Sequence, residues 1–80
     1  MYSLYILFSV LRNKYYIGHT NEATERLRKH NTNHKGFTGT ASDWVIVYTE
    51  RFSTKKQAYE RERKLKSWKN RKMIEDLIRS

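Results

Sequence analysis

The sequence contains no cysteine among its 80 residues, which excludes both a disulfide framework and a cysteine-ligated zinc site. No apolar run approaches the length of a membrane span, and the first residues lack the basic segment and cleavage site of a signal peptide. Repeats, linkers and low-complexity segments are also missing. With a hydrophobic content of 38 %, these features predict a single small domain over residues 1–80 that is soluble and cytoplasmic.

Acidic residues are few relative to basic ones. Eight Asp and Glu stand against 17 Lys and Arg, so the formal net charge is +9 and the pI is about 10.0. Such a charge on a small surface favours a polyanionic partner, and nucleic acid is the commonest. A merely solubilising surface mixes the two signs more evenly. A membrane surface is a weaker candidate, because no predicted helix combines a basic face with a broad apolar face.

Alternating apolar residues predict a β-hairpin near the start of the chain. Residues 3–10 and residues 15–20 both have strand character, and the polar connection between them is short. The expected loop pairs Val10 with Tyr15, which gives one mixed face and one more apolar face. The mixed face carries Tyr5, Leu7, Ser9, Tyr16 and Gly18, and the apolar face carries Leu4, Ile6, Phe8, Val10, Tyr15 and Ile17.

The middle of the chain predicts a helix, a loop and a third strand. Thr20 or Asn21 caps a helix that runs to about residue 31, followed by an irregular loop over residues 31–43. Residues 44–52 form the strand. Its alternation puts Val45, Val47 and Thr49 on one face and Trp44, Ile46 and Tyr48 on the other.

Two further helices complete the order. Thr54 and Gln57 form a capping box for a helix over residues 55–69, and a last helix covers residues 71–79. The last helix directs Met73, Ile74, Leu77 and Ile78 inward. The predicted fold class is α+β with the element order β-β-α-β-α-α.

Glu62 breaks the apolar stripe of the helix over residues 55–69. A carboxylate among apolar positions is costly unless it is paired or binds a cation. One interpretation is a partly buried salt bridge to Arg61, Lys66 or an arginine elsewhere. The other is a metal ligand, because a lone carboxylate that leaves Mg²⁺ mostly hydrated is usual at phosphate sites.

The mixed face of the hairpin is the second anomaly. Tyrosine favours strands, so Tyr5 and Tyr16 are explained by structure alone in the simplest interpretation. The opposite face is the more continuously apolar one, however, which makes it the better core. Gly18 removes a side chain where a backbone or ligand approaches closely, and we count it among the nucleic-acid contacts.

Arg26 and His30 lie one turn apart on the first predicted helix. Arg26 is adjacent to the stripe of Ala23, Leu27 and His30, from which its guanidinium reaches the sheet. A lone histidine is most often a boundary residue, and no cluster of acids supports a zinc site here.

A basic belt covers the last two helices. Its cations supply attraction to phosphates without reading sequence. Trp68 lies inside the belt, where it packs the junction of the two helices or stacks on a base. The belt consists of Arg61, Arg63, Lys64, Lys66, Lys69, Arg71 and Lys72.

These residues together resemble the GIY-YIG nuclease superfamily. Leu4-Tyr5-Ile6 and Tyr16-Ile17-Gly18 are similar to its two signature tripeptides, with Leu4 in place of the first glycine. Arg26, eight residues after Gly18, stands where the family has its arginine, and His30 matches the His or Tyr position four residues later. Residues 58–66 resemble the Glu-bearing helix of the short, stand-alone branch, which is similar to the N-terminal nuclease domain of excinucleases.

The resemblance implies a three-stranded antiparallel sheet flanked by helices, and a divalent-metal-dependent hydrolysis of phosphodiester bonds. It implies that Tyr5 and Tyr16 flank the attacking water, that Arg26 faces the scissile phosphate, and that Glu62 holds Mg²⁺ or Mn²⁺. His30 becomes an auxiliary proton carrier or phosphate contact. Asn70 is the only counterpart of a late asparagine of the family, and we place it with the nucleic-acid contacts.

The expected activity is that of a DNA endonuclease that is structure-selective or of low sequence specificity, with RNA left open as a substrate. Because no separate recognition domain is visible, a partner protein is a further expectation, and DNA repair or mobile-element defence is the setting. The alternative is a nucleic-acid-binding module with little or no cleavage. Whether Tyr16 or His30 accepts the proton stays open, since a free tyrosine has a pKa of about 10.

Overall fold

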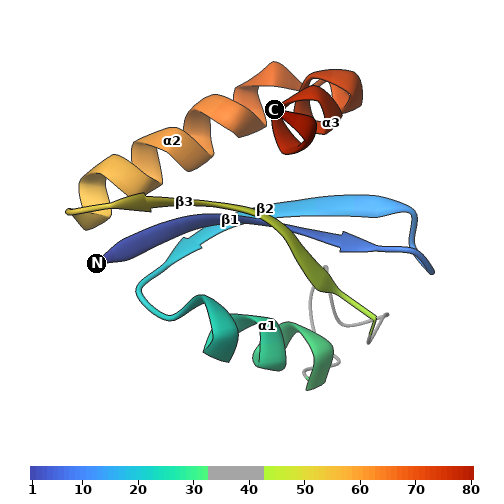
Figure 1. The fold of residues 1–80 in the computed structure, drawn as a ribbon, viewed down its shortest axis with the longest axis horizontal. Coiled ribbons are helices and arrows are strands. Elements are labelled where there is room, and N and C mark those ends of the chain that lie inside the picture. Colours follow the sequence, from blue (N-terminus) through green and yellow to red (C-terminus); the bar gives the residue numbers. More distant parts are fainter. Residues whose placement is uncertain (33–42) are drawn as a thin grey trace.

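The computed structural model describes residues 1–32 and 43–80, and over these residues the predicted fold class and element order are confirmed (Figure 1). The three strands form an antiparallel sheet in the order β2-β1-β3, with β1 at its centre. In Figure 1, α2 and α3 lie on one face of the sheet and α1 lies on the other. The elements are β1 (Tyr2–Ser9), β2 (Lys14–Thr20), α1 (Ala23–Thr32), β3 (Val45–Phe52), α2 (Lys55–Trp68) and α3 (Arg71–Arg79).

The hairpin of β1 and β2 has the predicted faces but not the predicted register. Leu7 pairs with Tyr16 and Ser9 pairs with Lys14, so the pairing is displaced by two residues from the expected one. An even displacement keeps every side chain on its face, because side chains alternate with period two. Val10 was wrongly placed on the apolar face: it lies in the turn after β1 and is 75 % exposed.

Each face of the sheet carries its own hydrophobic cluster. Leu4 and Ile6 pack with Leu65 of α2 and Ile74 of α3, whereas Tyr5, Leu7 and Trp44 form the second cluster. Leu27 of α1 packs against that second cluster. The central strand is therefore buried on both faces, which fixes the side chains that it contributes.

A β-bulge changes the predicted alternation of β3. The pairing with β1 shifts between Ile6 and Leu7, so Ile6 faces Tyr48 and Leu7 faces Ile46. The extra residue, Val47, and Tyr48 both pack against the Leu4 cluster, while Ile46 packs against the Tyr5 cluster. The expectation that Ile46 and Tyr48 share a face was wrong, because a bulge resets the period-two pattern.

The two last helices begin as the sequence predicts. The Thr54 hydroxyl accepts from the Gln57 backbone N–H, and the Gln57 side chain accepts from the Thr54 N–H, which confirms the capping box. Lys69 ends α2 in a left-handed conformation with φ 48°. Trp68 packs against the cluster that holds Leu65 and Ile74, at the junction of the two helices.

One inward position of α3 was wrong. Ile74 is buried and Leu77 and Ile78 pack against the same cluster, but Met73 is 41 % exposed. No helix within residues 1–32 and 43–80 is long and apolar enough to cross a membrane. The predicted loop over residues 31–43 lies largely outside the described residues, although α1 extends to Thr32.

Candidate active site

Two tyrosines from neighbouring strands face each other on the α1 side of the sheet. Tyr5 comes from the central strand β1 and is only 1 % exposed, and Tyr16 comes from the edge strand β2. Their ring centroids are 6.3 Å apart with an interplanar angle of 33°. The sequence prediction that the two phenols share a face is confirmed.

Gly18 makes room for the Tyr5 ring. The two residues are cross-strand partners in the hairpin. A Cβ atom built on Gly18 would lie 2.6 Å from the Tyr5 Oη and 2.7 Å from its Cζ, which is closer than any normal contact. The space that the sequence analysis left for a ligand is therefore filled by the phenol of Tyr5.

The electrostatic surroundings keep the Tyr5 phenol protonated. Burial raises the pKa of Tyr5 above its usual value, and the charges of Tyr16 and Glu62 act in the same direction. A hydrogen bond with the Arg26 guanidinium lowers this pKa without cancelling the effect of burial. Tyr5 is thus suited to donate a hydrogen bond rather than to accept a proton as phenolate.

Arg26 reaches the sheet from the first turns of α1. Besides its hydrogen bond with Tyr5, it lines a hollow of about 370 Å³ at the end of β2. Its side chain is exposed, so it is accessible to an anion from solvent. His30 lies on the same helix, but its side chain is outside what the structure describes. The hollow is lined by Tyr2, His19, Thr20, Asn21, Arg26 and Lys55.

Glu62 lies on α2, on the opposite side of the sheet from the tyrosine pair, and its side chain is 14 % exposed. Its Oε1 is 2.5 Å from His19 Nδ1 and its Oε2 is 2.7 Å from Lys66 Nζ. Burial would raise the pKa of Glu62, but the hydrogen bonds from His19 and Lys66 outweigh burial and hold that pKa below its usual value. The carboxylate is therefore ionised at neutral pH.

The predicted partners of Glu62 need one correction. Lys66 is a partner as expected, but Arg61 is not. Arg61 binds Glu50 of β3 with two hydrogen bonds, at 2.9 and 3.0 Å. The second partner of Glu62 is His19, which the sequence analysis did not single out.

His19 follows Gly18 on β2 and pairs with Leu4, so it lies on the face that α2 covers. Its ring also contacts Tyr59 of α2 at 5.5 Å in a T-shaped arrangement. The sequence did contain one indication of this role: His19 is a polar residue at a position of β2 that belongs to the apolar face, the face on which Glu62 lies.

The two groups of residues meet around the outer edge of β2. Tyr5, Tyr16 and Arg26 lie on the α1 side, whereas Glu62 and His19 lie on the α2 side. Lys66 connects the two sides, because its Nζ binds Glu62 and lies 5.9 Å from the centroid of the Tyr16 ring. Within residues 1–32 and 43–80, no strand pairs with this edge of β2.

The cations of the basic belt line different hollows. Arg61 and Lys64 line a hollow beside Phe52, Gln57 and Glu60, while Lys66 and Lys69 line a groove beside β2. Lys72 is exposed and pairs with Asp76. Of the belt, Lys66 approaches the tyrosine pair, with its Nζ 5.9 Å from the centroid of the Tyr16 ring, and Lys69 lines the same groove as Tyr16.

Three further members of the predicted contact set have local partners. Arg63 lies over the Tyr59 ring at 5.8 Å. The Asn70 side chain accepts from the backbone N–H groups of Lys72 and Met73 and so caps α3. Arg71 connects α3 with the hairpin turn by hydrogen bonds to Asn13 at 3.0 and 2.8 Å.

The donor set around Glu62 is compatible with a hydrated hard cation. No group of three or more His, Cys, Asp or Glu able to hold a metal occurs among residues 1–32 and 43–80. A single ionised carboxylate suits Mg²⁺, which keeps most of its water ligands. The two hydrogen bonds from His19 and Lys66 leave other lone pairs of the carboxylate for a cation.

Comparison with known proteins gives one positive result. A family model described as the GIY-YIG catalytic domain matches residues 1–75. The comparisons with curated proteins and with solved structures found no match.

Proposed function

This chain belongs to the GIY-YIG family, and from that premise we propose that it is a metal-dependent endonuclease that hydrolyses phosphodiester bonds in DNA. Nucleases of the family act on DNA and generally depend on a divalent metal. The observation that carries the proposal is the convergence of Tyr5, Tyr16 and Arg26 with an ionised Glu62 around one strand edge. A net charge of +9 supports a polyanionic substrate.

Each residue has a role that follows from its position. Glu62, held in place by His19 and Lys66, is the ligand for Mg²⁺ or Mn²⁺. When bound, the metal polarises the phosphoryl group and stabilises the leaving oxygen. Arg26, exposed and next to the Tyr5 phenol, contributes positive charge where negative charge develops on the phosphate.

The two tyrosines position the water molecule that attacks phosphorus. Tyr5 is protonated because burial raises its pKa, so it donates a hydrogen bond to a phosphate or water oxygen. Tyr16 comes from the edge strand, is half-buried and lies beside Lys66. Attack of the water forms a new phosphorus–oxygen bond and breaks the bond to the leaving sugar oxygen. The proton acceptor in this step is Tyr16 or a histidine.

The substrate is DNA read with little sequence preference. The exposed cations beside the site, such as Lys69, contact phosphates, and phosphate contacts carry no sequence information. A partner protein that supplies substrate recognition is part of the same proposal. DNA repair and defence against mobile elements are the settings that suit such an activity.

Nicking of supercoiled plasmid, flap and junction DNA in Mg²⁺ tests the proposal. We expect Glu62→Gln to lower the cleavage rate by about 10²- to 10³-fold, because loss of a charge-stabilising group at the phosphate has that order of effect. Glu60→Gln is the matched control, since Glu60 is exposed on the same helix and lines a hollow away from the site. Its cleavage rate should equal that of the unmodified chain.

Two results would contradict this proposal. Equal cleavage by the Glu62→Gln variant and the unmodified chain would remove the metal role of Glu62. Binding to all three DNA forms without cleavage, in Mg²⁺ and in Mn²⁺, would make the protein a nucleic-acid-binding module.

A further inference from the structure

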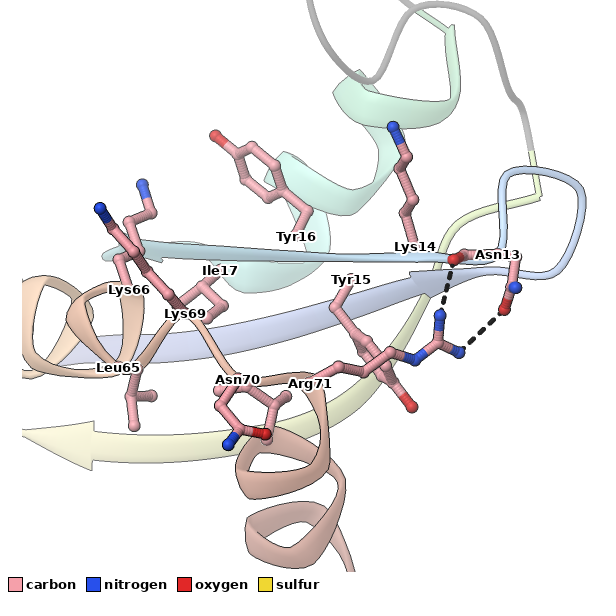
Figure 2. A pocket seen from close by; sticks show the side chains of 11 residues that line it. Asn13, Lys14, Tyr15, Tyr16, Ile17, Leu65, Lys66, Lys69, Asn70 and Arg71 are labelled. Atoms are coloured by element: carbon pink, nitrogen blue, oxygen red, sulfur yellow. Dashed lines mark hydrogen bonds between the residues drawn. The ribbon is translucent and has the colours of Figure 1, made fainter.

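A groove runs along the outer edge of β2, between that strand and the junction of α2 and α3 (Figure 2). Its volume is about 490 Å³, which is in the range of small-ligand clefts. One end of the groove includes Tyr16 and Lys66 and so adjoins the candidate active site. The groove is therefore placed to hold a part of the substrate that lies next to the reacting phosphate.

The groove combines an apolar floor with a cationic rim. The half-buried Ile17 and Tyr15 line it with carbon. Leu65 and Ile74 lie at its base, 1 % and 7 % exposed, and belong to the core cluster that fixes their positions. Lys66 and Lys69 both line the groove, and Figure 2 shows their ammonium groups extending beyond the strand edge. A bare phosphate would not contact the apolar floor favourably, and an apolar ligand would not interact with the cationic rim. A nucleotide has both a base for the floor and a phosphate for the rim.

The other end of the groove is closed by Arg71. Its guanidinium binds the Asn13 carbonyl at 3.0 Å and the Asn13 Oδ1 at 2.8 Å, as the dashed lines in Figure 2 show. It also lies over the Tyr15 ring at 5.2 Å. These contacts connect the hairpin turn to α3 at this end of the groove.

Lys69 is the most telling residue of the rim. Its backbone has φ 48°, in the left-handed region where glycine is the usual residue at a helix end. A residue with a Cβ atom is strained there, so the backbone at this position would suit glycine better than lysine. Among residues 1–32 and 43–80, the exposed Lys69 ammonium group has no hydrogen-bond or ion-pair partner. Its charge is available to a phosphate.

We propose that this groove receives one unpaired nucleotide next to the scissile phosphate, with its base on the apolar floor and its phosphate at Lys66 and Lys69. The inference rests on the proposed function and deepens it. A base in an intact duplex is paired and stacked, so it does not enter such a groove. The substrate class is accordingly DNA with an unpaired nucleotide at a flap, gap or mismatch, in preference to continuous duplex.

Binding in EDTA tests the groove separately from catalysis, because cleavage requires metal. Three labelled duplexes are compared by fluorescence anisotropy: fully paired, with a two-nucleotide thymidine flap, and with the same flap made abasic. We expect the thymidine flap to bind about tenfold more tightly than the abasic flap, which is the order of effect of one accommodated base. Equal affinity for the two flaps would make the groove a simple phosphate track and overturn the proposal.

Two variants test the rim. Lys69→Gly removes the charge at a position that glycine adopts without strain, so the fold is retained. It should weaken binding of both flaps by the same factor and reduce the slope of log Kd against log salt by about one. Lys56→Ala removes an exposed charge near the other end of α2 and should change neither quantity. A Lys69→Gly protein that binds as tightly as the unmodified chain would overturn the assignment of the rim.

Methyl NMR locates the base. The signals of Ile17, Leu65 and Ile74 should shift with the thymidine flap and stay in place with the abasic flap. Shifts confined to other methyl groups would overturn the proposal even if the affinities differ. If the protein discriminates between the flaps in EDTA but cleaves nothing in Mg²⁺, the proposed nuclease function is refuted and the proposed role of the groove is supported. If it cleaves DNA but does not discriminate between the flaps, the role of the groove is refuted and the nuclease function is supported.

Discussion

Replacing Gly18 with alanine places a methyl group where the Tyr5 ring now lies. The new carbon would be 2.6 Å from the Tyr5 Oη, 2.7 Å from Cζ and 3.1 Å from Cε2. The ring is not the loose end of a flexible chain, because Tyr5 is 1 % exposed and packs with Leu7 and Trp44. Relief therefore requires the ring or the hairpin backbone to move.

The magnitude follows from these contacts. Inserting carbon into a packed region costs about 1–3 kcal/mol of unfolding free energy. Backbone strain adds nothing, because Gly18 has no positive φ. The effect on cleavage should be larger than the effect on stability, because a displacement of about 1 Å in a reacting group lowers rates by about 10²-fold.

A double-mutant cycle separates this clash from any general effect of alanine in a strand. Urea unfolding is measured for Gly18→Ala, for Tyr5→Leu and for the double variant. Leucine at position 5 ends short of the atoms that clash, so Gly18→Ala should cost close to zero in that background. If the cost of Gly18→Ala is the same with tyrosine and with leucine at position 5, the reasoning is refuted.

Two further changes test other contacts. Glu50→Gln should lower stability at neutral pH by about 1–2 kcal/mol and flatten the acid dependence of urea unfolding. Burial raises the pKa of Glu50, but hydrogen bonds from Arg61 and Tyr48 outweigh burial and lower this pKa below the usual 4.5. The contribution of Glu50 to the free energy of unfolding is therefore complete above pH 4.5 and is lost as the pH falls further. An unchanged dependence of the unfolding free energy on acid pH would contradict this. Asn31→Ala should lower the free energy of unfolding by about 2–4 kcal/mol. The Asn31 amide accepts from the Trp44 N–H at 2.8 Å and donates to the Trp44 carbonyl at 3.0 Å, so both backbone groups lose a partner. A loss under about 1 kcal/mol in urea unfolding would contradict this.

The fold was predictable because local patterns carried most of it. Period-two apolar residues and the capping box of Thr54 and Gln57 identified strands and helices to within a residue or two. The register of the hairpin was wrong by two residues, since loop length alone selects among registers of the same parity. The bulge at Val47 could not be predicted, because the sequence of β3 alternates regularly and the extra residue appears only in the pairing with β1.

The site was predictable only in part. A carboxylate in an apolar stripe identified Glu62 as anomalous, but its partner His19 lies 43 residues away and no local pattern connects them. The role of Gly18 was also missed, because a glycine in a strand does not say what fills the space above it. Arg61 was assigned to phosphate binding on charge alone, and charge does not reveal its pairing with Glu50.

The position of β2 at the edge of the sheet explains how residues on opposite faces can contribute to the proposed site. In a central strand, the neighbouring backbone on both sides would separate the face of Tyr16 from the face of His19. At an edge, side chains of both faces reach around the strand, and Lys66 spans the two by contacting Glu62 and the Tyr16 ring. The central strand meanwhile supplies Tyr5, whose ring is held by burial. In the proposed function, a substrate that approaches this edge would meet the tyrosine pair, the carboxylate and the groove from one direction.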